Sequence, residues 1–182
     1  MYRIMLVDDE ENILNALRRV LLAGSGETNG PFTVETFTAP EAALKRGEST
    51  AFDLVISDYR MPGMNGVEFL KAFKRMQPNV ARLILSGYAD LDGLIGAINE
   101  VQIYRFLGKP WHDYDLKSAI AQALAYRGML LENQRLADQV RLQQGRLSRQ
   151  ELALRRLEEE SPGITKVNWG PDGSVIIDDE EL

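Results

Sequence analysis

Five residues with chemically active side chains each follow a short apolar run of the sequence. They are Asp8, Asp9, Asp58, Ser86 and Lys109. If the runs are neighbouring parallel strands, these groups meet at one edge of a sheet. Clustered carboxylates repel one another unless a divalent cation or raised pKa values relieve the charge. Their hard oxygen atoms suit Mg²⁺, which keeps several waters and takes phosphate oxygens as further ligands.

The elements that must position these residues are five strands and the helices between them. The short apolar runs cover residues 4–7, 32–37, 54–56, 81–85 and 103–107. Because each run is followed by a segment with helical spacing of apolar residues, the pattern predicts an α/β fold with a parallel sheet covered on both faces. The common doubly wound order for five such strands is 2-1-3-4-5. This order makes the first and third strands neighbours, so their terminal carboxylates are expected to lie close together.

The composition excludes several classes of function. The net charge is −6 and no cluster of Lys and Arg interrupts the acidic trend, so nucleic acid is not an expected partner. There is no cysteine, and hence neither a disulfide framework nor a thiolate metal site. No apolar run approaches membrane-spanning length and the amino terminus lacks a signal-peptide pattern, so we expect a cytoplasmic protein without membrane contact. A chain of 182 residues suggests one ordinary domain and a smaller appendage.

Four segments together resemble the receiver domain of two-component response regulators. They are LVDDE, ISDYRMPGMNG, LILSGYA and YRFLGKPW, all within residues 1–125. The resemblance implies a flavodoxin-like (βα)5 receiver domain and a signalling protein rather than an enzyme, with at most weak autophosphorylation and dephosphorylation of its own. The segment IYRFLGKPW is similar to receivers that often precede cyclic-di-GMP phosphodiesterase domains of the HD-GYP kind. Residues 126–182 carry no His–Asp pair in such a motif, so that activity is not implied.

The resemblance assigns a role to each acidic residue at the strand ends. Asp58 corresponds to the phosphoacceptor, which takes a phosphoryl group from a histidine kinase or a phosphotransfer protein. Asp9 and Asp58 correspond to the side-chain ligands of Mg²⁺. The Arg60 carbonyl corresponds to the backbone ligand, and Asp8 to an acid that acts through a water molecule. Independently, a carboxylate accepts a phosphoryl group only where its charge is neutralised, which a metal ion and an ammonium group can provide.

Further positions correspond to residues that stabilise the phosphoryl group and transmit its presence. Ser86 matches the hydroxyl that turns toward it, Lys109 the ammonium that pairs with it, and Phe106 the aromatic switch residue. Arg60 and Tyr88 match positions that tune the lifetime of the phosphoryl group. The implied response is a two-state change at the face made by the fourth helix, the fifth strand and the fifth helix, where a downstream protein partner would bind.

Beyond the receiver segment, the helical pattern continues. One register with alternating steps of four and three residues runs from Met129 to Leu157, and three of its seam positions are polar. These positions are Asn133, Gln143 and Gln150. The pattern predicts a coiled-coil helix over residues 126–160, continuous with the fifth receiver helix, that forms a homodimer of modest stability. Residues 161–182 are expected to form a β-hairpin or a disordered acidic tail.

Two other classes of protein share the predicted fold. Aspartate-nucleophile phosphatases usually place a second acid two residues after the nucleophile, where this sequence has Arg60. Flavin- or nucleotide-binding proteins need a Gly/Ser/Thr-rich phosphate loop after the first strand, whereas residues 8–11 are all acidic and would repel phosphate. We therefore expect a phosphorylation-controlled switch. The alternative is that the chain is a receiver–linker fragment of a longer regulator whose output domain is missing.

Overall fold

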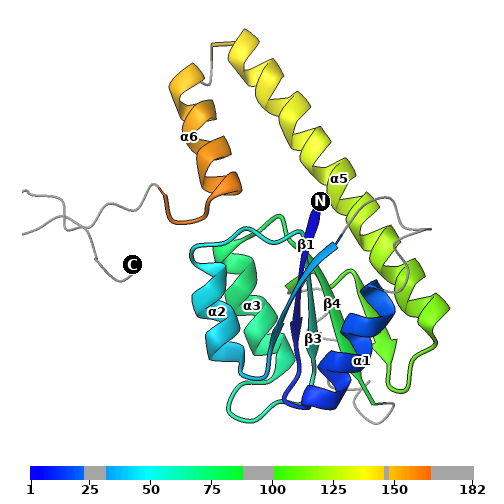
Figure 1. The fold of residues 1–182 in the computed structure, drawn as a ribbon. Helices are drawn as coiled ribbons and strands as arrows, with labels where there is room; N and C mark the ends of the chain where they lie inside the picture. Colours follow the sequence, from blue (N-terminus) through cyan, green and yellow to red (C-terminus); the bar gives the residue numbers. More distant parts are fainter. Residues whose placement is uncertain (23–31, 88–100, 146–147, 165–182) are drawn as a thin grey trace, which may run out of the picture.

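A five-stranded parallel sheet forms the centre of the molecule (Figure 1). The computed structural model describes residues 1–22, 32–87, 101–145 and 148–164. The strands are β1 (Tyr2–Val7), β2 (Phe32–Phe37), β3 (Leu54–Asp58), β4 (Ala81–Ser86) and β5 (Arg105–Gly108). Their order is β2-β1-β3-β4-β5 and every neighbouring pair is parallel. The predicted doubly wound flavodoxin-like topology is therefore confirmed.

Helices cover both faces of this sheet. Those in the described part of the chain are α1 (Glu11–Leu22), α2 (Pro40–Gly47), α3 (Gly66–Met76), α5 (Asp113–Gln143) and α6 (Arg149–Glu160). One apolar cluster lies under α1 and α5, and a second lies under α2 and α3. The fourth receiver helix was expected near residues 91–99, which fall outside the described residues.

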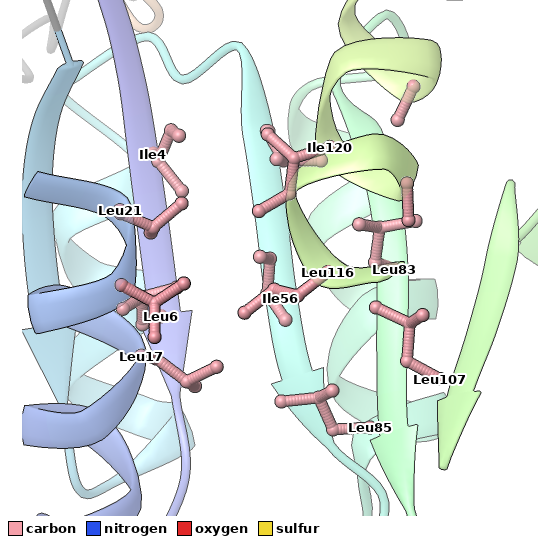
Figure 2. Packing of buried hydrophobic residues seen from close by; sticks show 14 of the residues in the cluster. Ile4, Leu6, Leu17, Leu21, Ile56, Leu83, Leu85, Leu107, Leu116 and Ile120 are labelled. Atoms are coloured by element: carbon pink, nitrogen blue, oxygen red, sulfur yellow. The ribbon is translucent and has the colours of Figure 1, made fainter. Parts of the chain in front are cut away.

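The strands alternate their side chains between the two apolar clusters. In β1, Ile4 and Leu6 belong to the cluster under α1 and α5, whereas Met5 and Val7 belong to the other. Figure 2 shows the cluster under α1 and α5, in which Leu17 and Leu21 of α1 and Leu116 and Ile120 of α5 point toward the central strands. Every residue of β3 is buried, including Asp58 at its end. The Asp58 side chain is therefore held in place at the carboxyl edge of the sheet.

The helix expected to run without a break to residue 160 is interrupted, and this prediction was wrong. Helix α5 is continuous as far as Gln143, and α6 then runs back toward the end of the sheet near α2 and α3 (Figure 1). Gly145 adopts a φ of +67°, in the left-handed region that glycine occupies at helix ends. Ser148 then opens α6 with a capping box, in which its side chain and that of Glu151 each bind the other's backbone N–H.

Only the first residues of the expected tail can be compared with the prediction. The chain is described as far as Ile164, and the predicted hairpin lies almost entirely in residues 165–182, outside the described residues. No helix among the residues that the structure describes has the length and apolarity needed to span a bilayer.

Candidate functional site

Asp58 is the last residue of β3, and its neighbours are held by backbone hydrogen bonds. The residue is only 5% exposed. Its Oδ2 atom accepts a hydrogen bond from the backbone N–H of Arg60 at 2.6 Å. The N–H of Tyr59 donates to the Leu85 carbonyl of β4 at 2.8 Å, which holds the turn after Asp58 against the neighbouring strand. The carboxylate therefore has a defined orientation at the carboxyl edge of the sheet.

Lys109 connects the ends of β1 and β3. Its Nζ atom lies 2.5 Å from Asp58 Oδ1 and 2.7 Å from Asp8 Oδ2. Asp8 is 1% exposed, and its other oxygen, Oδ1, accepts a hydrogen bond from the Glu10 backbone N–H at 2.9 Å. One ammonium thus neutralises part of the charge of two buried carboxylates. The sequence predicted that these groups gather here, but not that Lys109 binds Asp8.

Burial and this shared ammonium act on the pKa values in different ways. Burial raises the pKa of Asp8, and the hydrogen bonds from Lys109 and from the Glu10 backbone offset only part of that effect. Burial alone would lower the pKa of Lys109, but its hydrogen bonds to Asp58 and Asp8 outweigh burial and raise it. Lys109 therefore stays charged at neutral pH, next to the carboxylate that is the candidate phosphoacceptor.

Ser86 and Phe106 are placed by the next two strands. Ser86 ends β4 and is 1% exposed, and its hydroxyl donates a hydrogen bond of 3.4 Å to the Gly87 carbonyl. The Lys109 backbone N–H donates to the Ser86 carbonyl at 2.8 Å, which links the ends of β4 and β5. Phe106 lies on β5 opposite Ile84, half-buried against the cluster under α2 and α3. Tyr88, the other predicted residue of this region, lies outside the described residues.

The acidic residues provide oxygen donors of the kind that Mg²⁺ prefers. Asp8 and Asp58 converge on one point, and the Arg60 backbone is held directly against the Asp58 carboxylate. Asp9 is exposed. Within the described ranges, no group of three His, Cys, Asp or Glu side chains is close enough to hold a metal ion. The donor set therefore fits an ion that takes one or two carboxylates and completes its shell with backbone oxygen, water and phosphate.

Two residues beneath Asp58 were not predicted. Gly66, the first residue of α3, lies so close to the Asp58 carbonyl oxygen that a Cβ atom there would overlap it. Ser57 is fully buried and donates a hydrogen bond to the same carbonyl at 2.8 Å. Asn65 caps α3 through a capping box with Glu68, a signal that the sequence offered in its Asn-x-x-Glu spacing. The start of α3 is thus packed directly against the phosphoacceptor candidate.

Comparison with known proteins identifies the family. The family model described as the response regulator receiver domain matches residues 4–121, well over half of the chain. The chain therefore belongs to the response regulator receiver family. This confirms the resemblance that the strand-end motifs indicated, and with it a place among two-component signalling proteins.

Individual relatives agree with this assignment. The chain is 33% identical over 133 residues to the hydrogenase transcriptional regulatory protein HoxA of Cupriavidus necator, covering 73% of this chain and 26% of that protein. It is 32% identical over 121 residues to the transcriptional regulatory protein FixJ of Bradyrhizobium diazoefficiens, covering 66% of this chain and 56% of FixJ. The chain spans about a quarter of the length of HoxA, so the activity of that whole protein is not transferred to it.

Solved structures with a similar fold cover about 70% of the chain. The signal receiver domain of an HD domain-containing protein from Pseudomonas fluorescens Pf-5 has a TM-score of 0.64 and 36% identity, covering 70% of this chain and 98% of that chain. A protein from Neptuniibacter caesariensis has a TM-score of 0.66 and 40% identity, covering 72% of this chain and 93% of that chain. The first of these agrees with the predicted similarity to receivers of HD-type regulators.

Proposed function

We propose that this chain is a cytoplasmic phosphorylation switch, in which Asp58 accepts a phosphoryl group from a histidine kinase or a phosphotransfer protein. The observation that carries the proposal is the Lys109 ammonium, 2.5 Å from Asp58 and 2.7 Å from Asp8 at the carboxyl edge of the sheet. In phosphoryl transfer, a protein contributes little through covalent chemistry of its own. The transfer depends chiefly on positioning the two reactants and on neutralising the developing charge.

The Asp58 carboxylate is oriented for this transfer before any donor binds. The Arg60 N–H holds Oδ2, and Lys109 holds Oδ1. In the reaction, a carboxylate oxygen of Asp58 forms a bond to phosphorus while the bond from phosphorus to the donor's imidazole nitrogen breaks. Lys109 is placed to pair with the oxygens of the transferred group. In doing so, the Lys109 ammonium would leave Asp8. The Ser86 hydroxyl, which now donates to a neighbouring carbonyl, would supply one more donor.

Mg²⁺ is the cofactor that we propose for this site. When bound, it would neutralise charge on the carboxylates and on the phosphoryl oxygens. Asp9 and Asp58 would hold it through their side chains, the Arg60 carbonyl would be the backbone ligand, and Asp8 would act through a water molecule. The supporting observation is the convergence of Asp8 and Asp58 on one cation, which shows that the site already attracts positive charge.

The proposed response to phosphorylation begins at Ser86 and Phe106. Movement of the Ser86 hydroxyl toward the phosphoryl group would leave space that the half-buried ring of Phe106 can fill. The receiving surface is the face of the fourth helix, β5 and α5, of which the fourth helix lies outside the described residues. Output would then be a change in homodimerisation or in binding of a downstream protein. Arg60 and Tyr88 are proposed to set the phosphoryl lifetime, so Tyr88→Ala should shorten it.

The experiment is a mass measurement on the whole chain after incubation with acetyl phosphate and Mg²⁺. Asp53 provides a matched control, because it precedes β3 at the opposite edge and forms an ion pair with Arg127. Unsubstituted protein and Asp53→Asn should gain one phosphoryl group, and Asp58→Asn should gain none. Equal labelling of Asp58→Asn would overturn the assignment. Omission of Mg²⁺ should abolish labelling, and unchanged labelling in EDTA would overturn the cofactor.

A further inference from the structure

One loop residue ties both carboxyl-terminal helices to the receiver. Asn79, in the loop before β4, donates from Nδ2 to Glu159 Oε1 of α6 at 3.2 Å. Its Oδ1 accepts a hydrogen bond from Gln134 Nε2 of α5 at 3.0 Å, and its backbone carbonyl accepts one from Arg127 Nε at 3.0 Å. The hydrogen bonds that join α6 and α5 to this loop are therefore made by polar side chains at the protein surface.

The rest of the α6 interface is loosely packed. No residue of α6 is buried. Its ion pair to α5, between Arg155 and Asp138 at 3.4 Å, involves an arginine side chain that is 57% exposed, and pairs of that kind contribute little. A cleft of about 430 Å³, open to solvent on one side, lies between α6 and the receiver and is lined by Phe52, Met76 and others. Because α6 buries no side chain and its ion pair to α5 is exposed, little apolar surface holds it in place.

Apolar side chains lie on the outer faces of this helical hairpin. On α5 they are Met129, Leu136 and Val140, and on α6 they are Leu154 and Leu157; their exposed fractions range from 46% to 63%. We call these five residues the outer stripe. Five exposed apolar side chains in regular order on two helices are unfavourable unless another surface covers them.

The inner face of the hairpin uses different residues. Leu131 and Asp138 of α5 and Leu152 of α6 are half-buried and line the space between the two helices. On a helix with 3.6 residues per turn, Leu136 lies on the side opposite Asp138. The two halves of the outer stripe consequently point away from each other in the structure.

The two halves nevertheless belong to a single heptad register. Met129, Leu136 and Leu157 occupy one seam position at multiples of seven residues, and Val140 and Leu154 occupy the other. The register crosses the break at Gly145 without a shift, although only an unbroken helix would place both halves on one side. Such a seam is complementary to an identical copy of itself.

We propose that α6 is a detachable strap, and that its release lets α5 and α6 form one helix whose outer stripe docks on the outer stripe of a second copy of this chain. The inference rests on the homodimer proposed above, and adds that the hairpin formed by α5 and α6 opposes formation of that dimer. Asn133 falls on the same seam position as Val140, where a polar side chain favours one register and oligomeric state. Paired with Asn133 of the second copy, it would align the two helices.

The closed monomer, with α6 folded back, and the extended dimer are then in an equilibrium that depends on protein concentration. The hairpin is the form of the single chain, whereas the extended helix gains the partner's seam, so raising the protein concentration shifts the population toward extended dimers. Gly145 is the residue on which this equilibrium depends. Its positive φ suits the hairpin, and no heavy atom lies within 4 Å of a Cβ built there, so Gly145→Ala acts on the backbone alone.

The test measures the distance between the receiver and the end of α6. The chain has no cysteine, so Ser49→Cys and Ser161→Cys, both exposed, introduce a unique pair for spin labels. Labelled chains diluted into unlabelled chains report only distances within one chain. We expect a short distance at low concentration and a growing long-distance population as dimer forms. A short distance that persists in the fully formed dimer would overturn the strap while leaving the homodimer intact.

Gly145→Ala and Gly128→Ala form a matched pair for measuring dimer affinity by sedimentation. Both positions have open space around them, but Gly128 lies within α5, whereas Gly145 lies in the turn after it and has a positive φ. We expect Gly145→Ala to tighten the dimer about tenfold, and Gly128→Ala to change it less than about threefold. Equal affinity for Gly145→Ala and the unsubstituted chain would overturn the inference. If every chain remained monomeric, both the inference and the proposed homodimer would be overturned, whereas phosphorylation of Asp58 would be untouched.

Discussion

The carbonyl oxygen of Asp58 lies against the Cα atom of Gly66, with no room for a side-chain atom between them. The Gly66 N–H also donates to the Tyr59 carbonyl at 2.9 Å, so the start of α3 is joined to the turn that follows Asp58. Any side chain at residue 66 must push α3 away from the end of β3.

Gly66→Ala should therefore destabilise the chain by about 2–4 kcal/mol, because backbone rather than a flexible side chain must give way. Gly128→Ala is the control, since nothing lies within 4 Å of its Cβ and it sits within α5. It should stabilise the chain by about 0.5–1 kcal/mol. Urea denaturation followed by circular dichroism measures both. Equal effects of the two substitutions would contradict the close contact at Asp58.

The pH dependence of stability should change when Asp8 is replaced. Burial raises the pKa of Asp8 above its ordinary value of 3.8, so the folded chain holds this proton more tightly than the unfolded chain. The resulting stability is present below the unfolded pKa and is lost as the pH rises through the higher pKa of the folded state.

Asp8→Asn removes this loss of stability at higher pH, because the asparagine side chain does not ionise. In EDTA, the variant and the unsubstituted chain should differ least below about pH 4, and at pH 7.5 the variant should be the more stable of the two. Lys109 keeps its contact with Asp58 in this variant, so no cation is left unpaired. Urea denaturation at a series of pH values provides the measurement. A variant that is less stable than the unsubstituted chain at pH 7.5 would show that pairing with Lys109, not burial, dominates at Asp8.

Gln77 is the centre of a second buried hydrogen-bond network, away from Asp58. Its side chain accepts a hydrogen bond from the Phe52 N–H at 2.9 Å and donates to the Gly47 and Thr50 carbonyls at 2.8 and 2.7 Å. Gln77→Leu would leave these three backbone groups without that partner and should cost about 3 kcal/mol. Gln122→Leu, on the exposed surface of α5, should change stability by less than about 0.5 kcal/mol. Similar unfolding midpoints for the two variants would refute the role of the network.

The topology and the strand-end residues could be predicted because both depend on local sequence. Short apolar runs alternate with helical segments, and in a parallel sheet their polar ends necessarily meet at one edge. Asp58, Ser86 and Lys109 were found in this way, without knowledge of their contacts. The contact between Lys109 and Asp8 could not be predicted, because it depends on which of two neighbouring acids turns inward.

The break between α5 and α6 was missed for a different reason. The heptad pattern continues through Gly145, so apolar spacing alone favoured one helix. The signals against it were local: a glycine able to adopt a positive φ, followed three residues later by Ser148 in a Ser-x-x-Glu capping box. The heptad periodicity favours one helix and the capping signals favour two, and the structure has two helices.

The central claim is that Asp58 is the phosphoacceptor, and locating the acyl phosphate tests it most directly. The chain is incubated with acetyl phosphate and Mg²⁺, reduced with borohydride, which converts an aspartyl phosphate to homoserine, and digested for peptide mass analysis. We expect homoserine at residue 58 alone. Homoserine at Asp8 or Asp9, with residue 58 unchanged, would contradict it.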